Sequence, residues 1–351
     1  MKPNQLITDL PYILDTTPVV LKGSPGIGKT DIFKTVAANM NRELMISHPV
    51  MADPTDNKGM PCVVDMEDGT KVALWIPYGD LDKMMKATEP LIVFYDDLGQ
   101  ATPTVQAAIM QIILERSING QKISDQVRFI AATNKRTDRA GVKGIITPLL
   151  SRSNVLTLDV DVEDWIEWAF ENGQPPEMIA FVQFRPELLH QFDPRHVDAS
   201  GDDLVNQPCP RTVAACGNLF NVEKQKRDDT GEGWSAPFEV YSGAVGEAFA
   251  SEFLAFVSRI EKIGDLPRKI VAGKSPDCPE DPSTIFALSA CLSRLVEKNG
   301  FDTIGKWVGD KMPEEFAARF LHDSERQHGT KVTESSGYAD LAIKIDGFLS
   351  K

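Results

Sequence analysis

Short apolar runs alternate with helical patterns over the first half of the chain. The runs are rich in β-branched and aromatic side chains, which is typical of strands buried on both faces of a parallel sheet. They lie at residues 18–22, 43–47, 91–95, 127–132 and 155–158. Helices are predicted at about residues 1–17, 29–40, 79–87, 103–116 and 148–152. This alternation predicts an α/β fold with three layers, in which helices cover both faces of a parallel sheet.

A polar excursion at residues 49–77 interrupts the alternation. Within it, apolar runs at 63–64 and 72–76 flank a turn at 67–70, and this pattern predicts a β-hairpin. An Asn-Gly pair predicts a second hairpin at about 117–126. Insertions as long as this excursion are usually functional or disordered in a compact α/β domain.

The strand pattern stops at about residue 160, and only helical patterns follow it. Helices are predicted at residues 162–172, 176–190, 210–221, 244–262, 283–298 and 313–324. Polar stretches predict loops at residues 193–210 and 221–235, and a stretch rich in Pro and Asp predicts a boundary at 274–282. The predicted domains are an α/β core over 1–160 with an insert at about 51–77, an α-helical region over 161–273, and a helical C-terminal extension over 274–351.

Composition and charge narrow the classes of function. The 351 residues are 42% hydrophobic and 25% charged, which is ordinary for a globular protein of two or three domains. No apolar run approaches the ~18 residues of a membrane span, and no secretory signal is visible. The net charge of −14 weighs against nucleic acid as the main partner, because phosphate backbones normally bind to a basic face. One local basic patch is formed by Lys135, Arg136, Arg139 and Lys143.

The cysteines are few and scattered. No Cys-x-x-Cys pair occurs, and the histidines show no metal-ligand spacing either. The five cysteines are Cys62, Cys209, Cys216, Cys278 and Cys291. This pattern argues against a disulfide framework and against a zinc site, and it predicts a reducing compartment, the cytoplasm.

The stretch Gly23–Thr30 has the sequence and the context of a phosphate-binding loop, since a strand precedes it and a helix follows. Its glycines let backbone N–H groups turn towards phosphates, and the helix N-terminus adds partial positive charge. Lys29 can reach the β- and γ-phosphates of ATP, and the Thr30 hydroxyl can ligate Mg²⁺. The structural alternative is a glycine-rich turn that only joins strand to helix. The predicted nucleotide-binding residues are Gly23, Ser24, Pro25, Gly26, Ile27, Gly28, Lys29, Thr30 and Asp31.

Polar residues follow the two apolar strands at 91–95 and 127–132. Asp96 is predicted to hold the magnesium ion, and Asp97 to orient or deprotonate the attacking water. Asn134 is predicted to position that water near the γ-phosphate. The structural alternatives are two exposed acids in a turn and an ordinary turn asparagine.

Two arginines are candidates for contacts with the phosphates. Arg152 precedes a strand, where it is poorly placed for its own nucleotide but well placed to project towards a neighbouring subunit. Such an arginine finger is typically worth ~10³–10⁵ in turnover. Arg211 follows Pro210 at the predicted start of a helix and could point back at the phosphates. Each of them alone is more often a surface arginine.

These motifs together resemble those of an AAA+ ATPase, and more narrowly those of the MoxR-type branch. The shared motifs are Gly23–Thr30 (Walker A), Leu91–Asp97 (Walker B), Asn134 (sensor 1), Pro148–Arg152 (arginine finger) and Pro210–Thr212 (sensor 2). The resemblance to the branch rests on Asp53–Asp56 with Gly59 and Pro61, on Thr104–Ala108, and on Asn134–Ala140. The similarity covers about residues 10–265.

The resemblance implies a ring, a hexamer in particular, that hydrolyses Mg²⁺-ATP at its subunit interfaces. Arg152 would act in trans, and the helices over 161–273 would form a lid that carries Arg211. The inserts at 51–77 and 117–126 would lie at the face or the pore of the ring. MoxR-type proteins are chaperone-like remodellers that are commonly paired with a von Willebrand factor A-domain protein. The resemblance does not name the client protein.

One departure from the family pattern bears on hydrolysis. The family usually has Asp-Glu at the acidic pair, whereas this chain has Asp96-Asp97. The missing methylene withdraws the carboxylate, and a general base needs contact at about 2.6–3.2 Å or one bridging water. A low-turnover, ATP-dependent switch or scaffold is therefore the second interpretation. A DNA-directed AAA+ protein is the third, and the net charge of −14 disfavours it.

Overall fold

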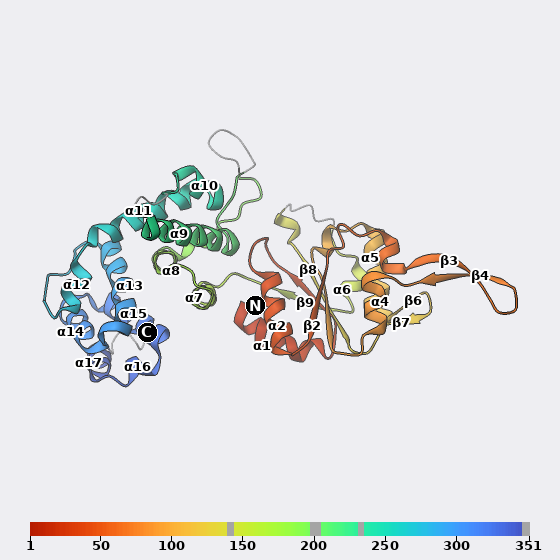
Figure 1. The fold of residues 1–351 in the computed structure, drawn as a ribbon, viewed down its shortest axis with the longest axis horizontal. Helices are drawn as coiled ribbons and strands as arrows, with labels where there is room; N and C mark the ends of the chain where they lie inside the picture. The colour runs from red at the N-terminus through yellow and green to blue at the C-terminus, as the bar shows by residue number, and fades with distance from the viewer. Residues whose placement is uncertain (139–143, 197–204, 231–234, 346–351) are drawn as a thin grey trace. The chain divides into compact units, whose positions relative to one another are not determined.

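The chain folds into two compact units (Figure 1). The computed structural model describes residues 1–138, 144–196, 205–230 and 235–345. The first unit consists of Met1–Asp164 and Phe192–His196, and the second unit contains the remaining described residues. The predicted division into a core, a lid and a C-terminal extension stays a prediction.

A parallel sheet forms the centre of the first unit. Its strands are β1 (Val19–Lys22), β2 (Glu43–Ser47), β5 (Leu91–Tyr95), β8 (Val127–Thr133) and β9 (Asn154–Thr157). The strands lie in the order β2-β5-β8-β1-β9, and every neighbouring pair is parallel. The apolar runs therefore do form the strands of one parallel sheet, as the sequence predicted.

Helices cover both faces of this sheet. They are α1 (Pro3–Leu14), α2 (Lys29–Asn39), α4 (Gly79–Lys86), α5 (Pro103–Glu115) and α6 (Thr147–Leu150). Ile92 and Phe94 of β5 belong to the core under α1 and α2, where the ring centroids of Phe94 and Phe33 lie 4.5 Å apart. Val93 and Tyr95 alternate to the other face and pack in the core with α4, α5 and α6. The predicted three-layer α/β fold is thus confirmed.

The direction of the strands decides which residues meet. The carboxyl ends of β1, β5 and β8 lie at one edge of the sheet, because the strands are parallel. Gly23, Asp96 and Asn134 directly follow these three strands, so the fold brings them together. Arg152 precedes β9 and lies at the opposite edge.

Two hairpins extend the first unit. After α3 (Pro54–Lys58), the antiparallel strands β3 (Met60–Asp65) and β4 (Lys71–Ile76) form the larger hairpin, which projects from the core in Figure 1. The smaller one pairs β6 (Ser117–Ile118) with β7 (Gln121–Lys122), directly after α5. Both predicted hairpins are present.

Beyond residue 160 the described secondary structure is helical, as the sequence predicted. The helices are α7 (Val162–Glu171), α8 (Pro176–Phe184), α9 (Pro210–Thr230), α10 (Phe238–Val245), α11 (Glu247–Ile263), α12 (Leu266–Val271), α13 (Pro282–Asn299), α14 (Phe301–Lys311), α15 (Glu314–His328), α16 (Thr330–Thr333) and α17 (Ser336–Lys344). Helices on the two sides of the predicted boundary at 274–282 contact each other, since α11 packs on α13 and α12 packs on α14.

The predicted loop at residues 221–235 is wrong over its first part, because α9 continues without a break to Thr230. The stretch is polar, but its Glu, Lys, Gln and Arg residues are good helix formers. Two contacts hold it in place. Lys224 pairs with Glu177 at 2.7 Å, and the buried Glu223 carboxylate accepts a hydrogen bond from the Tyr241 hydroxyl. The predicted helix at 176–190 also ends earlier, at Phe184, because Pro186 follows.

Several predictions fall on residues outside the described chain. They concern parts of the loops at 193–210 and 221–235, and Arg139 and Lys143 of the basic patch. Within that patch, Lys135 pairs with Asp159 at 3.6 Å. All five cysteines are described and are free thiols. Among the described helices, none combines the length and the apolar character that a membrane span needs.

Candidate functional site

The loop between β1 and α2 has backbone angles that require glycine. Gly26 has a φ of 73° and Gly28 a φ of 90°, in the left-handed region that side chains with a Cβ rarely adopt. Gly28 is the N-cap residue of α2, so the loop ends at the N-terminus of that helix. At the start of the loop, a Cβ on Gly23 would lie 2.6 Å from the Ile27 side chain. The loop thus leads directly into a helix N-terminus that can bind an anion.

Lys29 ties this loop to the end of the neighbouring strand, β8. Its side chain is 7% exposed, and its amine donates hydrogen bonds to the carbonyl oxygens of Gly23 and Ser24, both at 3.0 Å. The same amine donates to Oδ1 of Asn134 at 2.7 Å. A buried ammonium is well suited to accept an anion such as a phosphate oxygen among its partners.

Asn134 joins Lys29 to Asp97. Its Oδ1 accepts from the Lys29 amine, and its Nδ2 donates to Oδ1 of Asp97 at 3.1 Å. Only this orientation of the amide satisfies both neighbours, since an ammonium can only donate and a carboxylate can only accept. Asn134 is 6% exposed, so water competes little for these bonds. The three residues form one polar chain across the carboxyl edge of β1, β5 and β8.

Asp97 has an unusual backbone conformation, with a φ of 52° and a ψ of 34°. Asp is one of the few residues with a side chain that adopt the left-handed region at moderate cost. This conformation turns the chain sharply after β5 into a 3₁₀ turn, Leu98–Gln100. The turn places the Asp97 carboxylate beside Asn134.

Asp96 faces the Thr30 hydroxyl. The hydroxyl donates to Oδ2 of Asp96 at 3.2 Å, while Oδ1 of the same carboxylate accepts from the backbone N–H of Asp97 at 3.0 Å. Hydroxyl and carboxylate oxygens are the hard ligands that Mg²⁺ prefers, and this ion usually completes its shell with phosphate oxygens and waters. The pair therefore fits a magnesium ion. No group of three or more acidic, His or Cys side chains fit to hold a metal occurs among the described residues.

Two predicted site residues lie away from this cluster. Asp31 is in the first turn of α2, where its exposed carboxylate pairs with Lys34 at 3.0 Å. Arg211 is the second residue of α9 and belongs to the second unit. The hydrogen bond from the backbone N–H of Cys209 to the Thr212 hydroxyl, at 2.8 Å, shapes the turn that starts this helix. The roles of Asp31 and Arg211 stay predictions.

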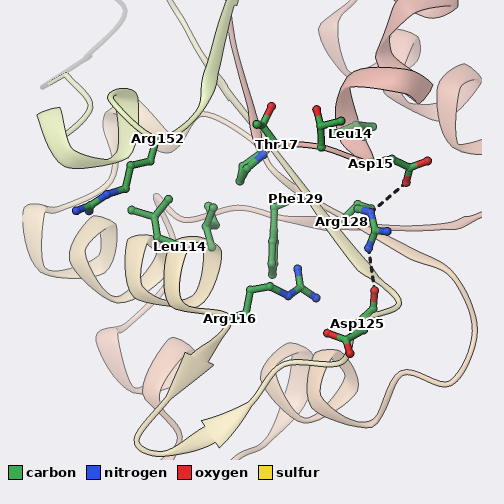
Figure 2. A pocket seen from close by; sticks show the side chains of 12 residues that line it. Leu14, Asp15, Thr17, Leu114, Arg116, Asp125, Arg128, Phe129 and Arg152 are labelled. Carbon is green, nitrogen blue, oxygen red and sulfur yellow. Dashed lines mark hydrogen bonds and ion pairs between the residues drawn. The ribbon is translucent and has the colours of Figure 1, made fainter.

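Arg152 lines a cavity at the amino edge of the sheet (Figure 2). The cavity has a volume of about 520 Å³ and contains two further arginines, Arg116 and Arg128. Both of these arginines have partners within the chain. Arg128 pairs with Asp15 at 3.2 Å, and Arg116 donates hydrogen bonds to the carbonyl oxygens of Val127 and Ser124. Burial, together with nearby Arg128, lowers the pKa of Arg116. The side chain of Arg152 is exposed and forms no such bond within the described chain.

One set of side-chain hydrogen bonds in the first unit was not evident from the sequence. Gln106 of α5 is 1% exposed, and its amide donates to the carbonyl oxygens of Ala101 and Gly144, at 3.2 and 2.9 Å. The amide oxygen of Gln106, Oε1, accepts a hydrogen bond from the backbone N–H of Ile146 at 3.2 Å. Gln106 therefore fastens the segment before α6, which leads to Arg152, onto the helix that follows Asp97.

Comparison with known proteins identifies the first unit. Residues 18–153 match the model of the AAA domain of the dynein-related subfamily. The first unit therefore carries an AAA+ nucleotide-binding domain, as the sequence predicted. The match does not reach the narrower MoxR-type branch. No curated protein matches the sequence.

Solved structures give remote similarities. The RuvB Holliday junction branch migration motor of Thermotoga maritima is 15% identical, with a TM-score of 0.37 over 87% of each chain. NtrX of Brucella abortus, in complex with ADP, is 15% identical with a TM-score of 0.39, over 98% of this chain and 67% of that chain.

Proposed function

Starting from the AAA+ domain of the first unit, we propose that this protein hydrolyses Mg²⁺-ATP in a ring and uses the cycle to remodel or assemble a protein partner. The observation that carries the proposal is the polar chain Lys29–Asn134–Asp97 beside the Thr30–Asp96 pair. It joins a phosphate-binding loop to a carboxylate that can act on water. A nucleotide-binding site without hydrolysis would need no such carboxylate.

Each residue of this cluster has a defined task in the proposed reaction. The loop amides and the Lys29 amine bind the β- and γ-phosphates, and the amine exchanges its carbonyl partners for phosphate oxygens. Asn134 then keeps its bond to Asp97 and orients that carboxylate. Asp97 accepts the proton of the water that attacks the γ-phosphorus, and the bond to the β-phosphate oxygen breaks. Magnesium, when bound, neutralises charge that develops on the phosphate oxygens.

A first prediction concerns the magnesium ligands. Asp96→Asn keeps the shape of the side chain, but it removes the charge that binds the cation. The affinity for ATP in the presence of Mg²⁺ should fall by roughly tenfold or more, while the affinity in EDTA should not change. Fluorescence titration with a labelled ATP analogue measures both values. Asp97→Asn is the matched control, and an equal loss in both variants would contradict the assignment.

Arg152 completes the site from a neighbouring subunit in this proposal. In its own subunit, Arg152 and the phosphate-binding loop lie at opposite ends of β1, which is about 13 Å long. Its guanidinium has no partner among the described residues and lines an open cavity, so it is available to a second chain. Arg211 would supply a further contact from the helical lid. The ring, a hexamer in particular, and the cytoplasmic location belong to the same proposal.

The MoxR-type branch specifies the task as chaperone-like remodelling, with a von Willebrand factor A-domain protein as the partner. Its support is the two hairpins, which occur where the resemblance expects the inserts of that branch. The most informative observation would be whether a neighbouring gene encodes such a domain.

One observation favours a second function, a low-turnover switch that assembles on ATP. Aspartate has a shorter side chain than the glutamate that is usual at this position in the family that the sequence resembles. In addition, Nδ2 of Asn134 donates a hydrogen bond to Oδ1 of Asp97 at 3.1 Å, which restrains the carboxylate. A measurement of steady-state phosphate release, together with size-exclusion chromatography with and without ATP, separates the two functions. Sustained turnover supports the remodeller, whereas assembly on ATP with almost no release supports the switch.

A further inference from the structure

The segment that carries Arg152 is short, and its two ends are held by the core. Helix α6 has a single turn, Thr147–Leu150, and Arg152 follows it closely. After Arg152, the backbone N–H of Asn154 donates to the carbonyl oxygen of Pro18 at 2.8 Å, so β9 is paired with β1 from its first residue. The exposed Arg152 side chain forms no bond of its own in the described chain (Figure 2). The backbone on its two sides therefore decides where its guanidinium lies.

Gln106 holds the start of this segment. Its Nε2 donates to the carbonyl oxygen of Gly144 at 2.9 Å, and its Oε1 accepts from the backbone N–H of Ile146 at 3.2 Å. Ile146 is the N-cap residue of α6, and its side chain forms no capping hydrogen bond. In a capping box, a Glu or Gln side chain of the same helix accepts from the N-cap N–H. At α6, a glutamine of another helix supplies this acceptor.

The hydrogen bonds of Gln106 allow only one orientation of its amide. Nε2 also donates to the carbonyl oxygen of Ala101 at 3.2 Å, so the donor end serves two carbonyls and the acceptor end serves one N–H. A flipped amide would turn its oxygen towards carbonyl oxygens, which can only accept. Gln106 is 1% exposed, so little water reaches these bonds. The side chain therefore holds residues 144–146 in one place relative to α5.

The segment is fastened to the part of the core beside Asp97. The backbone N–H of Gly144 donates to the carbonyl oxygen of Gly99 at 3.2 Å, in the 3₁₀ turn that follows Asp97. Leu149 of α6 is fully buried in the same core as the apolar face of α5. The base of this subunit and the arginine that it offers to a neighbour thus share one support. The question is which of the two depends on Gln106.

The turn after Asp97 does not need Gln106 to keep its shape. The turn, Leu98–Gln100, has two backbone hydrogen bonds of its own, 2.9 and 3.2 Å long. It also continues directly into α5, whose N-cap residue Thr102 accepts from a backbone N–H of the first turn. Loss of the Gln106 side chain should therefore leave the position of the Asp97 carboxylate nearly unchanged.

The start of α6 does depend on Gln106. In the described chain, the Gly144 carbonyl and the Ile146 N–H receive their hydrogen bonds from this one side chain. Both residues are only half-buried. Without Gln106, these two backbone groups would turn towards water, because an unpaired polar group inside a protein is unfavourable. Such a movement shifts the N-cap of α6 and, with it, Arg152.

We infer that Gln106 is a positioning residue for Arg152, which fixes the start of α6 so that the guanidinium reaches the phosphates bound to a neighbouring subunit. This inference rests on the proposed function, for which it names a further residue of the active site. An arginine finger acts only where its N–H groups meet the transferring phosphoryl group. A misplacement of about 1 Å can lower a rate by ~10²-fold.

The variant Gln106→Met tests this inference on the full chain, because it keeps the size of the side chain but removes its three hydrogen bonds. The kcat of phosphate release should fall by about 10–10²-fold, while the KM for ATP stays within about twofold, since no contact with the nucleotide is lost. Gln111→Met is the matched control on the same helix, where the glutamine amide donates to Glu115 at the surface. It should keep kcat within about twofold of the parent chain. An unchanged kcat in Gln106→Met would overturn the inference.

The double variant Gln106→Met/Arg152→Ala separates positioning from a general structural role. If Gln106 acts through Arg152, its loss has no further effect once Arg152 is absent, so kcat should match that of Arg152→Ala within about twofold. If Gln106 only stabilised the fold, or served Asp97, the two losses would multiply, and the inference would be wrong. Should thermal melting show that Gln106→Met does not fold, the same comparison is made with Gln106→Glu. That variant keeps the acceptor for Ile146 but lacks the amide donor.

Mixed rings give a second, independent answer. Gln106→Met subunits should regain turnover with Asp97→Asn subunits, which supply an intact Arg152, but not with Arg152→Ala subunits. The opposite pattern would place Gln106 in the Asp97 half of the site and overturn the inference, and so would a lack of recovery in both mixtures. If Arg152→Ala complements Asp97→Asn, these outcomes overturn this inference alone. A parent chain without turnover overturns the proposed hydrolysis, and the inference with it.

Discussion

Replacing Asp97 with Asn is expected to lower the turnover of ATP by ~10²–10⁴-fold, the usual contribution of a general base. Asn is nearly the same size as Asp and also tolerates the left-handed conformation that residue 97 adopts, so the turn after β5 should persist. What the variant loses is the negative charge that accepts the proton of water. Steady-state phosphate release at saturating ATP measures the effect.

Two controls define this result. The affinity of Asp97→Asn for ATP should remain within about twofold of the parent chain, because no phosphate contact is removed. Asp97→Glu restores the Asp-Glu pair that is usual in the family that this sequence resembles, and this variant should retain turnover. Equal turnover in Asp97→Asn and the parent chain would refute the assignment of the base.

Replacing Arg152 with Ala is expected to lower turnover by ~10³–10⁵-fold, because an arginine finger stabilises the charge of the phosphoryl-transfer transition state. The loss should appear in kcat and leave the fold unchanged, since the exposed Arg152 side chain forms no ion pair in the described chain. Arg128→Ala is the matched control in the same cavity. It breaks the pair with Asp15, so it should lower thermal stability but change turnover by only a few-fold.

Mixing subunits tests whether Arg152 acts in trans. Arg152→Ala subunits keep an intact Asp97, and Asp97→Asn subunits keep an intact Arg152. In a mixed ring, some interfaces join the intact halves, and turnover should return at those interfaces. If mixtures were as inactive as the two separate variants, Arg152 would not serve a neighbouring subunit.

The sequence predicts the core of the first unit well because local patterns specify it. The run Leu91–Tyr95 is buried on both faces, and an uninterrupted apolar run is the pattern that such a strand requires. Both hairpins follow from turn residues that favour them. Once the strands are parallel, the meeting of the loop, Asp96 and Asn134 at one edge follows from their order along the chain.

Other features depend on contacts that a local pattern does not encode. The bond between Lys29 and Asn134 joins residues far apart in the sequence, and the orientation of the Asn134 amide follows only from both of its neighbours. The left-handed backbone of Asp97 is likewise not indicated by the residues around it in the sequence. Helix α9 continues past residue 221 because Glu223 and Lys224 find partners on other helices. In each case, tertiary contacts override or complete a weak local preference.

The base of the β3–β4 hairpin shows the same limit of prediction from sequence. Asn119 and its neighbouring glycine predict a turn correctly, but the sequence does not indicate that the Asn119 amide also holds the base of another hairpin at Lys58. Gln106 is similar, because its position in a helical pattern predicts neither its burial nor its bonds to Gly144 and Ile146.

The central claim is that an active site, built on Lys29, Asp97 and Asn134, is complete only when Arg152 of a neighbouring subunit joins it. The most direct test is the rate of phosphate release per subunit, measured over a wide range of protein concentration at saturating Mg²⁺-ATP. The claim predicts that this rate rises steeply with concentration and reaches a plateau where size-exclusion chromatography shows the assembled ring. A rate per subunit that stays constant down to concentrations at which the chain is a monomer would contradict it.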